Sequence, residues 1–273
     1  MTALGNLDLL DGWEIPRVGL GVWQTPDGPD CERAVAAALE AGYRLIDTAQ
    51  DYGNELSVGR AIRASGIPRE EIFVTTKFRP DGRQPFTAAQ ESVERLGLDY
   101  LDLYLVHWPE GGPTWAWPEL EQAAKAGLTR SIGVSNFSAD EMAELAKVAE
   151  IPAVLNQVYF SPFVHRRGLA EFCENAGVVL QAYSPLGTGD HLTDPVVQRI
   201  AAETGHTPAQ VLIRWAYDRG VSVIPKSANP ARITENFAIA DVHLDTAALE
   251  ALDALDTSGG TSAAMYPNGK WWS

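Results

Sequence analysis

A regular alternation between short apolar runs and amphipathic runs constrains the fold of this chain more than any other feature. Amphipathic runs at 30–42, 55–66 and 84–97 each end in Gly, which is favoured just after the last turn of a helix. About eight strand-then-helix units in this length favour a closed (β/α)8 TIM barrel over an open sheet. The sequence therefore predicts one barrel domain over residues 1–273. The expected strands are the apolar runs at 43–49, 72–78, 101–108, 130–137, 152–160, 178–186 and 221–227, with a weaker run at 237–244.

The two ends of the chain depart from this alternation. Near the start, Asp11-Gly12 lies between apolar runs, which predicts a β-hairpin that precedes the barrel and caps its bottom. The tail at 257–273 is rich in Gly and Ser and ends in Trp271 and Trp272, which we expect to dock on the protein.

The charge and cysteine content limit the environment and the partners. A net charge of −15 and a pI of about 4.7 argue against nucleic acid or an anionic membrane as partner, since both require a basic face. The first residues lack a signal peptide's basic and apolar regions, and no apolar run reaches the roughly 18 residues of a membrane span. Cys31 and Cys173 are far apart and are expected to be reduced thiols. We therefore expect a cytoplasmic protein.

Polar residues stand where the first three expected strands end. Asp47, Lys77 and His107 end these strands, and Tyr52 lies in the loop after the first of them. Strand ends of a closed barrel converge on one mouth, where such barrels carry their chemistry. The four side chains are therefore expected to share a pocket.

Together these side chains could protonate an oxygen on which negative charge develops. A lysine in a barrel core needs a carboxylate partner, and Asp47 can supply it. The ammonium of Lys77 would favour ionisation of Tyr52, and His107 could orient a substrate oxygen. Reduction of a carbonyl by hydride creates an oxygen of this kind.

Other interpretations of the same residues stay open at this point. Asp47 could cap a turn, Lys77 could reach solvent, and His107 could be a hydrogen-bonded core residue. A metal site is not expected, because the five histidines show no HxH or HxxxH spacing. A retaining glycosidase would need two carboxylates at strand ends, and apart from Asp47 these ends are not acidic.

Three stretches resemble signatures of the aldo-keto reductases, which are NAD(P)H-dependent (β/α)8 barrels. They read "GYRLIDTAQDYGNELSVG" at 42–59, "TRSIGVSNF" at 129–137 and "IPKSANPARITENFA" at 224–238. Their order and spacing also match, with "TTK" and "LVHWP" between the first two. The chain is most similar to the microbial branch that resembles 2,5-diketo-D-gluconate reductase.

This resemblance implies a catalytic tetrad of Asp47, Tyr52, Lys77 and His107, with Tyr52 as the proton donor. It implies NADP(H) bound across the barrel mouth, and the chain offers no complete GxGxxG motif of a dinucleotide fold. Lys226 and Arg232 match the pocket for the 2′-phosphate, so NADPH is preferred over NADH. The other matched cofactor residues are Ser135, Asn136, Gln157, Tyr183, Ser184, Leu186, Gly187, Ser227, Glu235 and Asn236.

The expected substrate is a small carbonyl compound, with Trp23, Tyr52, His107 and Trp108 as the residues that contact it. Many relatives carry a Trp two residues after the catalytic Lys, where this chain has Arg79, which suggests a more polar pocket wall. A monomer is expected. The alternative function is a non-catalytic barrel that binds NADP and acts as a sensor or regulatory subunit.

Overall fold

The computed structural model describes residues 4–80 and 82–263, so Trp271 and Trp272 lie outside the described residues. Its centre is one sheet of eight strands, in which all neighbouring strands are parallel. The strands follow one another around the sheet in chain order. They are β3 (Leu20–Gly21), β4 (Leu45–Asp47), β5 (Phe73–Phe78), β6 (Leu101–Val106), β7 (Thr129–Ser135), β8 (Leu155–Tyr159), β9 (Val179–Tyr183) and β10 (Ser222–Ile224).

The first and last strands of this sheet meet and close it. Val18 and Val223 form a parallel bridge, and Gly21 forms another with Lys226. The backbone N–H of Gly19 donates to the Val223 carbonyl oxygen at 2.9 Å. The barrel predicted from the sequence is therefore confirmed.

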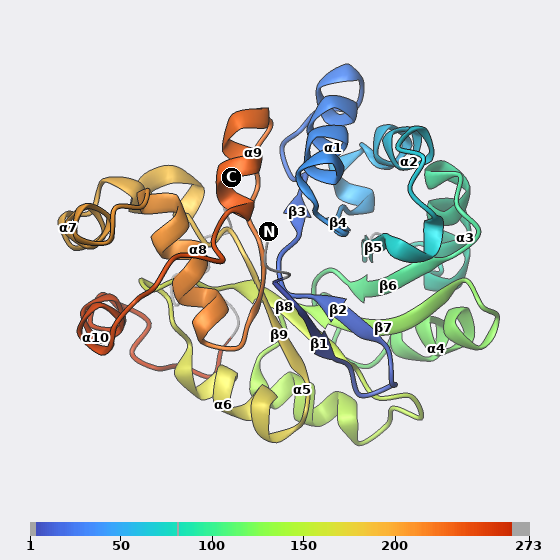
Figure 1. Cartoon of the computed structure of the whole chain (residues 1–273). Coiled ribbons are helices and arrows are strands. Elements are labelled where there is room, and N and C mark those ends of the chain that lie inside the picture. The colour runs from blue at the N-terminus through green and yellow to red at the C-terminus, as the bar shows by residue number, and fades with distance from the viewer. Residues whose placement is uncertain (1–3, 81, 264–273) are drawn as a thin grey trace.

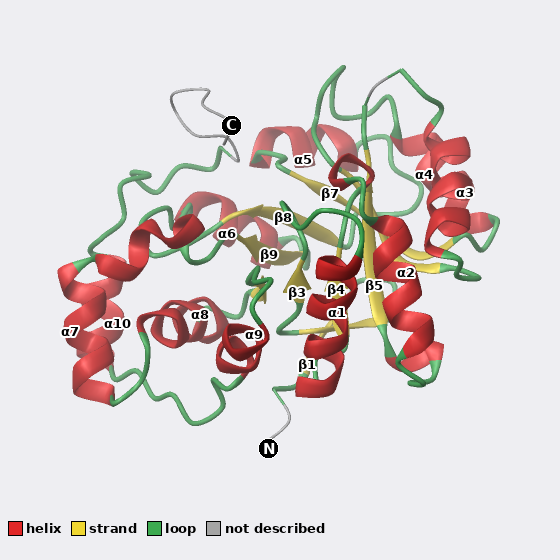
Figure 2. Ribbon diagram, turned by 90° about the horizontal axis from the view of Figure 1, so that it is seen from above, coloured by secondary structure: helices red, strands yellow, loops and turns green. Residues whose placement is uncertain are grey.

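The helices surround the strands on the outside (Figure 1). In Figure 2, α2, α3 and α4 lie on one side of the strands and α7, α8 and α10 on the other. Helices α1 and α3 end at Gly42 and Gly97, whose φ angles of 105° and 61° lie in the left-handed region. The helices are α1 (Pro29–Ala41), α2 (Glu55–Ala64), α3 (Pro85–Leu96), α4 (Trp117–Lys125), α5 (Ala139–Ala146), α6 (Arg167–Asn175), α7 (Pro195–Thr204), α8 (Pro208–Asp218), α9 (Pro230–Phe237) and α10 (Thr246–Asp253). Short 3₁₀ turns are η1 (Gln50–Tyr52), η2 (Arg69–Glu71) and η3 (Gly187–Thr193).

The prediction for the first and last barrel strands was wrong. The run at 43–49 contains the second barrel strand, because β3 precedes it in the segment that follows the N-terminal hairpin. Residues 238–244 form loop and turn in the described chain. Ile239 and Val242 in this stretch are buried against the main core, so their apolar character reflects packing outside the sheet.

The N-terminal hairpin is confirmed. Strands β1 (Asn6–Asp8) and β2 (Glu14–Pro16) pair antiparallel, and the N–H of Gly12 donates to the Leu9 carbonyl at the turn. Leu9 and Ile15 are buried together with residues from the beginnings of several barrel strands, such as Leu45 and Phe73. The hairpin thus closes the amino-terminal end of the barrel.

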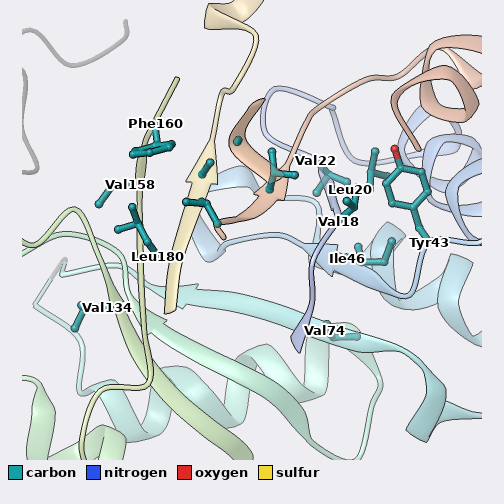
Figure 3. Close-up of a cluster of buried hydrophobic side chains, with 14 of the residues drawn as sticks. Val18, Leu20, Val22, Tyr43, Ile46, Val74, Val134, Val158, Phe160 and Leu180 are labelled. Carbon is teal, nitrogen blue, oxygen red and sulfur yellow. The ribbon is translucent and has the colours of Figure 1, made fainter. Parts of the chain in front are cut away.

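Alternation along the strands separates two apolar layers. Ile46 and Val74 point outward to the helices and belong to the larger cluster, part of which is drawn in Figure 3. Their neighbours Leu45 and Phe73 point into the barrel. With a period of two residues, Asp47 follows Leu45 on the inner face, and Lys77 follows Phe73 by two steps. The same two-residue period places Leu103, Leu105 and His107 on the inner face.

No helix among residues 4–80 and 82–263 is long and apolar enough to cross a bilayer.

Candidate active site

A cavity opens at the carboxyl ends of the barrel strands, opposite the hairpin. Three of the predicted catalytic residues line it, Asp47, Tyr52 and His107. Trp23 and Trp108, which were predicted to contact substrate, also line it. Residues from distant parts of the sequence are thus brought together as expected from the convergence of strand ends.

Lys77 and Asp47 form a buried ion pair at the base of this cavity. Nζ of Lys77 donates to Oδ1 of Asp47 at 2.6 Å and to the carbonyl oxygen of Thr48 at 2.8 Å. Burial lowers the pKa of Lys77, and the Asp47 carboxylate opposes this effect. The pair therefore holds an ammonium group inside the barrel, with two oxygens already bound to it.

Tyr52 lies beside this ammonium. Its hydroxyl oxygen is 3.4 Å from Nζ of Lys77, and Nζ lies 4.9 Å from the ring centroid. Burial raises the pKa of Tyr52 well above its ordinary value, and the negative charge of Asp47 adds to the rise. The expected lowering by Lys77 alone is thus outweighed, because desolvation disfavours a phenolate. The phenol keeps its proton at neutral pH.

His107 faces Tyr52 across the cavity. The two rings meet edge to face with centroids 5.8 Å apart, and the His107 ring stacks on Trp108. The backbone of His107 is held on both sides: its N–H donates to the Phe78 carbonyl, and its carbonyl accepts from Nδ2 of Asn136 at 3.0 Å. Burial lowers the pKa of His107.

One charged residue of the cavity wall was not predicted from the sequence. Asp51 lines the cavity, with Oδ2 3.1 Å from Nδ1 of His107 and Oδ1 3.0 Å from Nε of Arg79. Arg79, which suggested a polar wall, is thus paired with a carboxylate. The sequence signal was present, since Asp51 directly precedes Tyr52, but a rule that considers only strand ends overlooks it.

Half of the predicted cofactor residues line the same cavity. Tyr183 ends β9, and its hydroxyl donates to Oδ1 of Asn136 at 2.9 Å. Nε2 of Gln157 donates to Oδ2 of Asp47 at 2.7 Å, which links these residues to the ion pair. The lining members of the predicted set are Ser135, Asn136, Gln157, Tyr183, Ser184 and Lys226.

The other half is not among the described residues that line the cavity. Leu186 and Gly187 follow β9, where the ring of His191 fills the space beside Gly187. Arg232 is exposed in the first turn of α9, whose amino end is capped by Asn229. The remaining members of this half are Ser227, Glu235 and Asn236.

The arrangement offers a defined chemistry. A protonated phenol and an imidazole line one cavity with aromatic walls, and a buried ammonium lies beside the phenol, so a carbonyl oxygen bound there would meet two possible proton donors. Lys226, exposed at the cavity, donates a long bond of 3.5 Å to the Gln24 carbonyl. Such a cation has spare donor capacity for an anionic group.

Known proteins share this sequence and architecture. The model of the "Aldo/keto reductase family" matches residues 17–257. An aldo-keto reductase of Mycobacterium sp. (strain MCS) is 46% identical over 257 residues, which cover 92% of this chain and 90% of that protein. The 9,11-endoperoxide prostaglandin H2 reductase of Trypanosoma cruzi (strain CL Brener) is 43% identical over 267 residues, 94% of each chain. The crystal structure of an aldo/keto reductase from Brucella melitensis superposes with a TM-score of 0.88 at 40% identity, over 92% of this chain and 99% of that one.

Proposed function

Because the chain belongs to the aldo/keto reductase family of NAD(P)-dependent oxidoreductases, we propose that it reduces aldehydes, ketones or dicarbonyl compounds to alcohols with NADPH. The contact between Tyr52 and Lys77 carries this proposal. A phenol whose oxygen lies 3.4 Å from a buried ammonium can give up its proton to a substrate oxygen while the ammonium stabilises the phenolate that remains.

The residues at the mouth fit a nicotinamide dinucleotide. The flat ring of Tyr183 and the amides of Asn136 and Gln157 line the cavity, and the Tyr183 hydroxyl is bonded to Oδ1 of Asn136; a planar carboxamide ring can stack and form hydrogen bonds there. Lys226 at the cavity and Arg232 in the first turn of α9 are exposed cations in a chain with 21 basic and 36 acidic residues. This pair suits a phosphate dianion and supports NADPH over NADH. Asp47, in contrast, belongs to the ion pair beside Tyr52, where the oxygen of the substrate has to receive its proton.

When bound, the reduced cofactor supplies the hydride for the carbonyl carbon. Tyr52 donates its hydroxyl proton to the carbonyl oxygen, so the C=O double bond gains one hydride and one proton and becomes an alcohol. Asp47 keeps Lys77 in place through the 2.6 Å ion pair. His107 orients the carbonyl oxygen toward Tyr52, and Trp23 and Trp108 bound the substrate and exclude water.

The finer assignments rest on the sequence. We place the chain in the branch that resembles 2,5-diketo-D-gluconate reductase on its motifs, and we propose a cytoplasmic monomer with one domain over residues 1–273. The natural substrate is set by the loops around the mouth. The reductase of Trypanosoma cruzi acts, by its name, on an endoperoxide of prostaglandin H2, which makes a lipid endoperoxide a reasonable additional compound to test.

The test is NADPH consumption with methylglyoxal, an aromatic aldehyde and a keto-sugar acid. Tyr52→Phe should lower kcat/KM by about 10²–10⁴-fold, the usual contribution of a positioned acid. NADPH binding, followed by fluorescence of the cavity tryptophans, should be retained. Tyr100→Phe, which removes the hydroxyl of a tyrosine whose ring packs against Arg69 and Arg130 instead, is the matched control and should leave turnover unchanged.

The outcomes separate the two functions. Turnover that Tyr52→Phe removes while binding persists supports the reductase. Tight NADPH binding with no turnover of any compound would instead favour the sensor function, and absence of binding would contradict both.

A further inference from the structure

The carboxylate of Asp51 lies between a histidine and an arginine at the cavity. Oδ1 is 3.0 Å from Nε of Arg79, and Oδ2 is 3.1 Å from Nδ1 of His107. The side chain of Asp51 is 24% exposed, whereas that of His107 is 8% exposed. Asp51 and His107 are at ion-pair distance, but within the described chain the contact does not have the near-linear N–H···O geometry of a hydrogen bond. Coulomb attraction depends on distance and not on that angle, so the carboxylate still stabilises a positive charge on the ring.

The position of Asp51 is built into the turn that carries Tyr52. Both residues belong to η1, and the side-chain amide of Gln50 donates to the Ala88 carbonyl and to Oγ of Ser92, both at 2.9 Å. The oxygen of the same amide accepts from the backbone N–H of Arg79 at 3.2 Å. Gln50 thus ties η1 to α3 and to the segment after β5, which brings Asp51 and Arg79 together.

The protonation state of His107 decides what it can do for a carbonyl oxygen. To donate a hydrogen bond from Nε2, the ring must be either the neutral Nε2–H tautomer or the imidazolium. In the neutral Nε2–H tautomer, Nδ1 carries a lone pair, and its partial negative charge would lie 3.1 Å from the carboxylate oxygen of Asp51, which is repulsive. A carboxylate beside Nδ1 therefore favours the states that carry a proton there, and of these only the imidazolium can also donate from Nε2.

We propose that Asp51 is a positioning residue that keeps Nδ1 of His107 protonated, so that the imidazolium is the form that donates from Nε2 to the substrate oxygen. This inference rests on the proposed reductase function, in which His107 orients the carbonyl. Arg79 pairs with the carboxylate of Asp51 and offsets part of its negative charge. Asp51 therefore favours the protonated ring of His107, but the ring can still release its proton.

Other charges around His107 act in both directions. Burial lowers its pKa, and the ammonium of Lys77 on β5 adds to this effect, whereas Asp51 in η1 and Asp47 on β4 oppose it. Asn136 after β7 contributes a neutral amide to the backbone carbonyl, and Trp108 contributes a neutral ring. Burial keeps the pKa of Tyr52 well above its ordinary value, so the titration of His107 is not confused with that of Tyr52. Of these two carboxylates, Asp51 is the one that forms an ion-pair contact with a ring nitrogen of His107 in the described chain.

The test measures the pKa of His107 directly by ¹H–¹⁵N NMR titration of the five histidines, with the His107 signal assigned from its loss in His107→Asn. Asp51→Asn should lower that pKa by about one unit, since an opposite charge at this distance shifts a pKa by about 1–3 units and Arg79 offsets part of it. Asp51→Glu should restore most of the shift. Glu110→Gln, which removes an exposed carboxylate three residues beyond His107, is the matched control.

The pH profile of reduction is the second readout. The limb of kcat/KM that falls with rising pH should move to lower pH by the same unit in Asp51→Asn, which leaves about tenfold less activity above both pKa values. Glu110→Gln should show neither change.

Each outcome decides the inference. A lower pKa of His107 together with a shifted limb in Asp51→Asn, both reversed in Asp51→Glu, supports it. An unchanged pKa overturns it, and so does a lower pKa with an unmoved limb. A wild-type protein with no turnover would instead contradict the proposed function, while the NMR titration would still show whether Asp51 sets the pKa of His107.

Discussion

Lys77 and Asp47 form an ion pair of 2.6 Å inside the barrel, with side chains 0% and 2% exposed. The pair joins β5 to β4, and Gln157 on β8 donates to the other oxygen of Asp47 at 2.7 Å. A buried ion pair is costly when one partner is removed, because the remaining charge is left without compensation. The pair proposed to act in the reaction therefore also contributes to the stability of the barrel.

The first prediction concerns this pair. Asp47→Asn and Lys77→Met should each lower the free energy of unfolding by about 3–5 kcal/mol, the usual cost of a broken buried pair. The double variant should lose clearly less than the sum of the two, because no uncompensated charge remains. Urea unfolding of the four proteins measures this coupling. Additive losses would mean that the two charges do not stabilise each other.

The second prediction concerns the close approach of α2 and α3. A Cβ placed on Gly59 would lie 1.8 Å from the Leu96 carbonyl oxygen, which is backbone and cannot turn aside. Gly59→Ala should therefore shift the two helices and cost about 3 kcal/mol, the upper part of the range for overpacking.

Gly66→Ala is the control for this variant. A Cβ there meets nothing within 4 Å, and only its φ of +70° is unfavourable, so the loss should be about 1 kcal/mol. The difference between the two urea midpoints is the measurement. Equal losses would show that the contact with Leu96 relaxes easily.

Much of the site followed from the sequence because strand geometry is regular. In a strand with a period of two, Phe73 precedes Lys77 on the inner face by two steps, and Leu103 and Leu105 precede His107; Lys77 and His107 lie toward the ends of their strands at the same mouth. The alternation shows directly which residues share the inner face of each strand, and so the grouping of Asp47, Lys77 and His107 could be predicted.

The parts that were missed depend on geometry that the pattern does not carry. Strand β3 is two residues long and lies next to Gly19, so it lacks the apolar run that marks a strand. Its pairing with β4 and its bridges to the segment around β10 come from closure of the barrel. The contact of Asp51 with His107 depends on how Gln50 anchors η1, and a list of strand ends does not include that.

The third prediction concerns stability in mild acid. Burial lowers the pKa of both His165 and His191, so the unfolded chain binds more protons than the folded one below about pH 6.5. The stability from these groups is complete above that pH and is lost as the pH falls below it. The ring of His191 stacks on Phe163 with centroids 3.9 Å apart, and its Nε2 lies 2.9 Å from the hydroxyl of Tyr159, so its neutral form is well packed.

The measurement for this effect is Tm at pH 7.5 and at pH 5.5, where few carboxylates titrate. Tm should be lower at pH 5.5, and the drop should become smaller in His191→Gln. A Tm that stays constant over this window would contradict the assignment of buried neutral histidines.

The last prediction concerns the choice of cofactor. Arg232 is exposed in the first turn of α9, and its backbone N–H is already satisfied by the side chain of Asn229, so its guanidinium is the group available to an anion. If it binds the 2′-phosphate, Arg232→Ala should weaken NADPH by about 10–100-fold, since hydrogen bonds to charged groups contribute about 1.5–3 kcal/mol. NADH lacks that phosphate and should bind as before. Arg199→Ala removes an exposed arginine of α7 that pairs with Glu203 and serves as the control. Dissociation constants for both cofactors, followed by tryptophan fluorescence, give the ratio. An unchanged NADPH/NADH ratio in Arg232→Ala would remove Arg232 from the phosphate pocket, and with it the main physical reason for preferring NADPH.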